Sequence, residues 1–254
     1  MKDCTSLLKQ FKFNAKENVK TRGFKKDPVG DSYAKIEDGI LQKYKGRLLV
    51  LASDKCARQC RFCFRRNTPI KKASPEALRK ALTLNKDIKE VILSGGDPMM
   101  LKKKELQKFF DVIPAHIRIR IHTRIVNFNP LFEKLGSRLT FVSHINHPAE
   151  LNEKTAKNFS KLAKCGVTLL NQSVLLKGVN DNAEILAELS EKLFSQRVLP
   201  YYLHQLDRAQ GTAHFEVPIK KAKQIVKELK GMVSGYLVPR FVREIKGEKS
   251  KVWV

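Results

Sequence analysis

The chain has 254 residues, of which 50 are lysine or arginine and 25 are aspartate or glutamate, so its formal net charge is +25. Hydrophobic residues make up 42% of the chain, which excludes a disordered protein and suffices for one large core. No apolar run approaches about 18 residues, and the first residues lack an apolar signal region. The sequence therefore predicts a cytoplasmic protein without a membrane partner.

The positive charge is spread along the chain, and its longest run is only Lys102–Lys104. A basic surplus favours an anionic partner such as nucleic acid, but scattered lysines also occur on solvated surfaces that bind nothing. The even distribution favours the second interpretation. A nucleic-acid partner is therefore not expected, although charge alone does not decide the question.

From residue 46 onward, six short apolar runs alternate with helical patterns. The predicted strands are Arg47–Ala52, Glu90–Ser94, Ile117–His122, Leu139–His144, Val167–Gln172 and Val198–Leu203. Repeated strand–helix units predict an α/β fold with a parallel sheet and right-handed crossovers. Since six units are too few for a closed eightfold barrel, we predict an open, partial, TIM-like (β/α)6 barrel with its active site at the carboxyl ends of the strands.

Local signals place several helices between these strands. Ser74 followed by Pro75 is typical of a helix N-cap and first position, and Asn152 begins a helix that Gly166 can end. Two further helices are predicted over Asp181–Gln196 and Pro218–Val233. We divide the chain into a lysine-rich accessory segment (1–45), the barrel core (46–234) and a tail (235–254).

Five cysteines occur, and three of them fall within eight residues: Cys56, Cys60 and Cys63. An odd, clustered set without a secretion signal argues against a disulfide framework and favours a metal site. Cys165 ends a helical stretch and is interpreted as a buried small residue, and Cys4 is assigned no role.

Three thiolates on one loop suit an iron–sulfur cluster better than zinc. A structural zinc site takes four ligands, commonly as two pairs, and the sequence has no second CxxC pair. A [4Fe–4S] cluster usually takes four protein thiolates, so three would leave one iron open for a ligand. The spacing also places all three sulfurs directly after the first predicted strand, at the mouth of the barrel. We therefore predict that Cys56, Cys60 and Cys63 bind a [4Fe–4S] cluster, with a structural zinc site as the weaker alternative.

This CxxxCxxC loop, with the aromatic Phe62 before its last cysteine, resembles that of the radical S-adenosylmethionine (SAM) superfamily. A second shared element, Ser94–Gly95–Gly96–Asp97, follows the second strand. Glycines allow close backbone approach, and a strand-end carboxylate can accept a hydrogen bond from an ammonium group. The resemblance implies that these four residues bind the methionine end of SAM.

Further segments resemble the lysine 2,3-aminomutase family, most closely its branch linked to elongation factor P modification. They follow in unbroken order from about residue 40 to the end: Cys63–Arg66, Ile119–Arg124, Ser143–His147, Asn171–Leu176, Pro200–His204, Gln210–Phe215 and Ser234–Pro239. The final stretch, Arg243–Lys251, is similar to the elongation-factor branch.

The resemblance implies three cofactors: the cluster, SAM and pyridoxal 5′-phosphate (PLP). PLP chemistry requires an amine that holds the cofactor, and the family's lysine corresponds to Lys251. Lys251 lies beside other tail lysines, so without the family it would be interpreted as solvated. Arg47, at the start of the first strand, corresponds to the phosphate-side arginine, although it could equally cap a strand or pair with an acid.

The resemblance also implies a lysine-binding site with opposite charges at its ends. Arg65 corresponds to the carboxylate-binding arginine, and Asp207 and Glu244 correspond to two ammonium-binding acids. Glu244 departs from the aspartate of the free-lysine enzymes, and a salt bridge to a neighbouring cation is its alternative interpretation. His144 and Gln172 correspond to positions that contact SAM, with purely structural roles as the alternative.

The implied activity is an isomerisation in which a radical derived from SAM starts migration of the amino group of L-lysine from C2 to C3, giving β-lysine. The implied partners are an electron donor such as flavodoxin or ferredoxin and, through the product, an elongation factor P–lysine ligase. The oligomeric state stays open, a homo-oligomer included. Two alternatives remain: a radical SAM enzyme acting on RNA and a cluster-bearing nucleic-acid-binding module.

Overall fold

The protein is described by a computed structural model that covers residues 6–69 and 71–254, so Cys4 lies outside the described residues. Ten strands form one sheet in chain order. The strands are β1 (Lys35–Glu37), β2 (Ile40–Leu41), β3 (Arg47–Ser53), β4 (Glu90–Gly95), β5 (Arg118–Thr123), β6 (Leu139–His144), β7 (Thr168–Val174), β8 (Leu199–His204), β9 (Arg240–Arg243) and β10 (Val252–Trp253). The helices of more than one turn are α2 (Pro75–Leu84), α3 (Lys103–Asp111), α4 (Glu153–Lys164), α5 (Ala183–Ser195) and α6 (Ile219–Met232).

The strands from β3 to β9 run parallel, and the short strands at both edges run antiparallel. All six predicted strands are present, so the predicted α/β open barrel is confirmed. The structure adds β9 as a seventh parallel strand. Its four residues begin and end with exposed arginines, which leaves too short an apolar run for recognition in the sequence.

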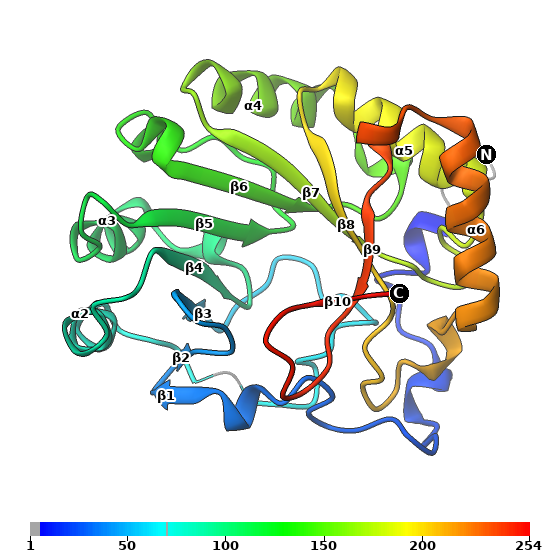
Figure 1. Ribbon diagram of the computed structural model, residues 1–254, viewed down its shortest axis with the longest axis horizontal. Coiled ribbons are helices and arrows are strands. Elements are labelled where there is room, and N and C mark those ends of the chain that lie inside the picture. Colours follow the sequence, from blue (N-terminus) through cyan, green and yellow to red (C-terminus); the bar gives the residue numbers. More distant parts are fainter. Residues whose placement is uncertain (1–5, 70) are drawn as a thin grey trace.

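Helices cover the outer side of the curved sheet, and the C-terminal hairpin lies toward its inner side (Figure 1). Within the described residues β1 and β10 remain the two edges, so the sheet does not close. The helices begin as expected: Ser74 accepts a hydrogen bond from the Ala77 N–H, and Asn152 caps α4 in the same way. No helix in the described ranges is long and apolar enough to cross a membrane.

One connection departs from the predicted strand–helix alternation. Between β5 and β6 the described chain contains only two short 3-10 turns, Pro130–Phe132 and Gly136–Arg138. Pro130 starts the first turn, and Gly136 has a φ of +51°, so both interrupt a regular helix in an already short segment. This connection nevertheless buries Leu131 and Phe132 against the sheet.

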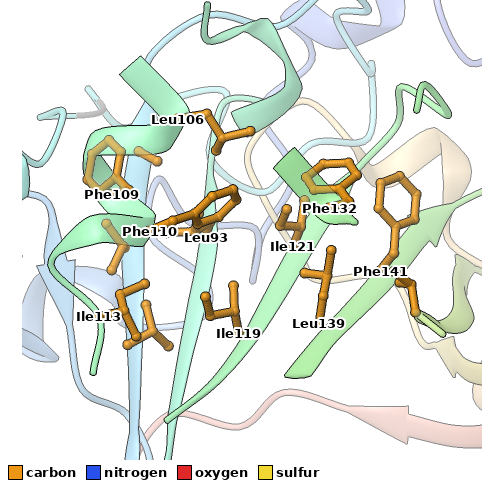
Figure 2. Packing of buried hydrophobic residues seen from close by; sticks show 14 of the residues in the cluster. Leu93, Leu106, Phe109, Phe110, Ile113, Ile119, Ile121, Phe132, Leu139 and Phe141 are labelled. Atoms are coloured by element: carbon orange, nitrogen blue, oxygen red, sulfur yellow. The ribbon is translucent and has the colours of Figure 1, made fainter. Parts of the chain in front are cut away.

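Alternation along the strands separates an apolar outer side from a polar inner side. Ile119 and Ile121 of β5 are fully buried and pack with Leu106 and Phe110 of α3 in the main core (Figure 2). The intervening side chains must point to the opposite side of the sheet. There Arg120 of β5 pairs with Glu90 of β4 at 2.5 Å. The inner side of the barrel is therefore polar and charged, as a ligand site requires.

Candidate active site

The cysteine loop follows β3 directly. Cys56 is exposed, Cys60 and Cys63 are half-buried, and all three are free thiols. The Cys63 N–H donates to the Cys60 carbonyl at 3.1 Å, which turns the loop between the last two cysteines. Burial raises the pKa of the Cys56 thiol to about 11, and the charges of Asp97, Cys63 and Cys60 act in the same direction. The three thiols therefore lie within electrostatic reach of one another.

Gly95, the last residue of β4, and Gly96 after it allow close contact between this strand end and the cysteine loop. Gly95 has a φ of +113°, and a Cβ on Gly96 would lie 2.4 Å from the Lys55 carbonyl oxygen. The Gly96 N–H donates to Ser53 at 2.6 Å, and the Asp97 N–H donates to Lys55 at 2.7 Å. The glycine-rich element is thus attached to the first residues of the cysteine loop, a constraint that sequence reasoning did not anticipate.

The Asp97 carboxylate is already bonded to the protein. Its Oδ1 accepts hydrogen bonds from the Thr123 hydroxyl at 2.6 Å and the Met99 N–H at 3.0 Å. Its Oδ2 accepts one from the Arg124 N–H at 2.9 Å. Burial raises the pKa of Asp97, although these hydrogen bonds oppose the shift. Asp97 therefore joins the ends of β4 and β5, and a ligand ammonium would have to share its oxygens.

The N-terminal segment is hydrogen-bonded to the cysteine loop. The buried Arg61, next to Cys60, donates through Nε to Glu17 at 2.8 Å and through Nη1 to the Lys9 carbonyl at 2.7 Å. The Arg61 N–H donates to the carbonyl of Gln10, which is itself fully buried. No sequence pattern predicts these contacts, because Glu17 lies in an irregular, lysine-rich segment.

The donor set of the loop fits an iron–sulfur cluster. Three free thiols on one loop, with no disulfide among them, match the thiolate ligands that such clusters take. Across residues 6–69 and 71–254, no three histidine, cysteine or acidic side chains are already gathered around one point. Because each thiolate of such a cluster binds a different iron, the three sulfurs need not converge on one point.

His144 and Gln172 lie side by side at the carboxyl ends of β6 and β7, where they are paired in register. The His144 ring contacts the Phe62 ring of the cysteine loop, with 5.7 Å between centroids. Burial lowers the pKa of His144 to about 3, so the ring is neutral. Within the described structure, its buried Nε2 has no hydrogen-bond partner and is available to a ligand. Phe62 thus connects the cysteine loop to this strand end.

Lys251 precedes β10, the edge strand that pairs with β9. Its Nζ lies 2.5 Å from Glu244 Oε2 and 5.9 Å from the centre of the Tyr202 ring. Glu244 Oε1 accepts a hydrogen bond from the Tyr44 hydroxyl at 2.8 Å. Burial favours the neutral acid, but Lys251 and Lys43 outweigh it and lower the pKa of Glu244. Glu244 is therefore held as a carboxylate.

A second set of ion pairs continues from Glu244 to Arg65. Lys43 Nζ lies 3.5 Å from Glu244 Oε1 and 2.7 Å from Asp31 Oδ1. Arg65 Nε donates to Asp31 Oδ2 at 2.6 Å. We call Asp31, Lys43, Arg65, Glu244 and Lys251 the charge network. Asp31 and Lys43 were missed in the sequence because neither lies in a recognisable motif.

Asp207 lies beside this network. Burial raises its pKa to about 7, with Lys251 opposing the shift and Glu244 adding to it. A cavity of about 530 Å³ opens here, and Asp207 and Glu244 are among its lining residues. Arg47 contacts Tyr44, with its guanidinium 4.7 Å from the Tyr44 ring centre. Tyr44 therefore links Arg47 to Glu244. The structure thus brings Arg65, Asp207, Glu244 and Lys251 together.

Two half-buried histidines, His122 and His204, complete the inner side of the barrel. Burial lowers the pKa of His122 and of His204 well below the ordinary value, and the charge of Lys251 acts in the same direction. The Nε2 of His122 is buried without a hydrogen-bond partner among the described residues. His122 therefore offers a neutral ring nitrogen to a ligand in this part of the barrel.

Solved structures support the class of fold. A radical SAM methyltransferase from Sphaerobacter thermophilus aligns with 80% of this chain and 68% of its own, at a TM-score of 0.57 and 15% identity. The AdoMet-bound structure of anSMEcpe aligns with 71% of this chain and 57% of its own, at a TM-score of 0.54 and 13% identity. Together with the cysteine loop after the first parallel strand, these similarities define a radical SAM fold.

Proteins of similar sequence identify the family more narrowly than the solved structures do, although no family model matches the chain. Proteins named L-lysine 2,3-aminomutase are 43% identical in Buchnera aphidicola, 44% in Haemophilus influenzae and 42% in Escherichia coli. These alignments cover 98%, 92% and 96% of this chain and 78%, 75% and 76% of the relatives. The chain belongs to the lysine 2,3-aminomutase family and is a radical SAM isomerase. Membership implies SAM and an iron–sulfur cluster as cofactors.

Proposed function

We propose that this enzyme converts L-lysine to β-lysine with PLP as an additional cofactor. The observation that supports this most strongly is that the charge network and the adjoining Asp207 bring Arg65, Asp207 and the tail residues Glu244 and Lys251 together from three separate parts of the chain. An RNA-modifying enzyme or a nucleic-acid-binding module would have no need for this arrangement.

The charges of these four residues complement those of lysine and PLP. Arg65 offers a planar pair of donors for the substrate carboxylate, while Asp207 and Glu244 offer acceptors for its ε-ammonium. Arg65 and Lys251 are each paired with an internal carboxylate, Asp31 and Glu244 respectively. Ligand groups of the same charge can replace these partners, so binding does not require an unpaired buried charge to exist beforehand.

Each cofactor has its own set of residues in this proposal. Cys56, Cys60 and Cys63 hold the cluster; Ser94, Gly95, Gly96, Asp97, His144 and Gln172 contact SAM; Lys251 and Arg47 hold PLP. When bound, the cluster and SAM supply a carbon radical that abstracts hydrogen, and PLP supplies the conjugated system through which the nitrogen migrates.

The chain itself positions groups and moves one proton. Lys251 must lose a proton before its amine can attach to a carbonyl group, and Glu244 Oε2 at 2.5 Å is placed to accept it. The Tyr44 hydroxyl fixes the other oxygen of Glu244 at 2.8 Å and so orients that acceptor. The neutral rings of His122, His144 and His204 line the site without adding positive charge.

We further propose that the enzyme acts in the cytoplasm and receives its electron from a protein such as flavodoxin or ferredoxin. Free thiols suit a reducing compartment. The tail from Arg243 to Lys251 supports a role in supplying β-lysine for elongation factor P through a ligase. A coupled assay with purified ligase and elongation factor P should add the mass of one lysyl residue to the factor only when this enzyme is active.

An anaerobic assay tests the activity itself. The enzyme, reconstituted with iron, sulfide and PLP, should form β-lysine from L-lysine when SAM and a reductant are present, and none when SAM or PLP is omitted. Binding of RNA with a steep dependence on salt, without β-lysine formation, would transfer support to the RNA-directed alternative.

A further inference from the structure

Arg124, which follows β5, is a buried cation that the proposed function does not use. Its side chain is 8% exposed, and its Nη2 pairs with Glu150 Oε2 at 2.5 Å. The same nitrogen lies 3.4 Å from Gln10 Oε1. Among the described residues no hydrogen-bond partner exists for Nε or Nη1, although both are buried. Because a buried guanidinium ordinarily has its donors satisfied, the Nε–Nη1 edge is available for an anion.

The surroundings of Arg124 fix its orientation. Glu150 Oε1 accepts hydrogen bonds from the Asn146 N–H at 2.9 Å and the Gln10 side chain at 3.2 Å, so this carboxylate cannot move freely. The guanidinium carbon lies 5.0 Å from the Phe11 ring centre and 5.7 Å from that of Phe62. These contacts hold the Arg124 guanidinium in one orientation, with its Nε and Nη1 donors free among the described residues.

The Arg124 guanidinium adjoins the cysteine loop. Phe62 lies between Cys60 and Cys63 in the sequence, and the Arg124 backbone N–H is bonded to Asp97 at the end of β4. The charge of Arg124 also reaches the Cys60 thiol, where it opposes the effect of burial on the thiol pKa. A cluster held by three thiolates is anionic and becomes more so on reduction, so it matches the free donors in charge.

We propose that Arg124 is a positioning residue for the iron–sulfur cluster, whose free guanidinium edge donates to the anionic cluster and raises its reduction potential. Hydrogen bonds to the sulfurs and local net charge are among the factors that set such potentials. The proposal rests on the assignment of Cys56, Cys60 and Cys63 as cluster ligands. It makes reduction of the cluster easier before SAM is cleaved.

The test is a redox titration of the reconstituted cluster followed by electron paramagnetic resonance, without SAM. Arg124→Gln should disfavour one-electron reduction by about tenfold, a shift of about 59 mV to lower potential. Arg124→Lys keeps the charge but has no planar fork, so an intermediate shift is expected. Glu150→Gln removes the opposing negative charge and should shift the potential upward.

Arg58→Gln is the matched control. Arg58 lies 3.6 Å from the same Glu150 and 5.4 Å from the same Phe11 ring, but its side chain is 49% exposed. Solvent screens that charge, so the potential should not change. A merely structural role would lower the iron content of several variants without shifting the potential in opposite directions.

Two outcomes would overturn the proposal. One is an unchanged potential in Arg124→Gln enzyme that holds a full cluster. The other is a shift that appears only after SAM is added, which would place the free edge against SAM instead. Absence of a cluster from the wild-type enzyme is a different result, because it contradicts the assigned function rather than the role of Arg124.

Discussion

The cysteine loop and the charge network are prepared for their ligands in different ways. The three cysteines of the loop are free thiols, and burial raises the pKa of Cys56 and of Cys60, which favours their neutral form. In the charge network each ionised group already has a partner of opposite sign, as in Arg65 with Asp31 and Lys251 with Glu244.

The difference reflects what each region must bind. Neutral thiols are stable without a partner of opposite charge, so the loop needs no internal ion pair before a cluster binds. Buried charges are costly when alone, so a site for a zwitterionic substrate is stable only if its charges pair internally until the ligand arrives.

Cys63→Ala should abolish activity. With only two thiolates, a second iron would lose its protein ligand and the cluster would be held too weakly. Iron and sulfide content should therefore fall sharply, and SAM cleavage should reach background. The measurement is iron and sulfide analysis with detection of 5′-deoxyadenosine. Cys165→Ala serves as the control, because Cys165 caps α4 on the outer side of the barrel. A Cys63→Ala enzyme with a wild-type cluster spectrum would disprove the assignment.

Arg65→Gln should raise the KM for lysine by about 10- to 100-fold, since a hydrogen bond to a charged group contributes about 1.5–3 kcal/mol. Arg65→Lys should fall between, because it keeps the charge without the fork. Steady-state kinetics at saturating SAM give the values. Arg79→Gln, at an exposed position of α2, should behave as wild type. An unchanged KM in Arg65→Gln would remove Arg65 from the carboxylate site.

Asp207 should make lysine binding depend on pH. Burial raises its pKa to about 7, and only the ionised form attracts an ammonium group. The KM for lysine should therefore rise as the pH falls below 7, by up to about tenfold per unit. Asp207→Asn should give a high KM that no longer changes in this range. A parallel pH dependence in both proteins would assign the titration to another group.

Stability supplies a second readout for Asp207. Because its folded pKa is raised above the ordinary 3.8, ionised Asp207 destabilises the fold, and this cost develops as the pH rises from about 4 to about 7. Asp207→Asn should therefore raise the Tm of the ligand-free protein at pH 8 and leave it nearly unchanged below pH 4. An equal gain at both values would indicate a packing effect instead.

Tyr44→Phe should have the smallest effect. Without the Tyr44 hydroxyl, Glu244 still pairs with Lys251 and Lys43, so only part of its orientation is lost, and turnover should fall by about fivefold while the cluster spectrum stays unchanged. Single-turnover kinetics with a cluster spectrum recorded on the same sample would measure both. Tyr33→Phe is the control, since the Tyr33 hydroxyl is not part of the charge network; equal losses in both variants would contradict a specific role for Tyr44.

The sequence predicted the two regions with unequal success. Cys56, Cys60 and Cys63 share one loop, and their spacing carries its own chemical meaning, so they were recognised directly. Lys251 and Asp207 became candidates only through family resemblance, because an acid or lysine far along the chain has no local signature. Asp31 and Lys43 were not found at all, since their partners come from chain positions that only the fold brings together.

Elements of the fold that depend on distant partners were likewise not predicted from the sequence. Apolar runs gave the six strands from β3 to β8, whereas β9 and the two-residue strands β2 and β10 are defined by their partners rather than by their own residues. The helix expected between β5 and β6 is replaced by short turns because Pro130 and Gly136 interrupt it.

The proposed function requires that Lys251 holds PLP in the same enzyme that carries the cluster. Borohydride reduction of the anaerobically reconstituted protein, followed by peptide mapping, tests it directly. We expect one PLP adduct, on the peptide containing Lys251, and its loss in Lys251→Arg but not in Lys249→Arg. A protein with an intact iron–sulfur spectrum and no adduct, or with the adduct at another lysine, would contradict this account.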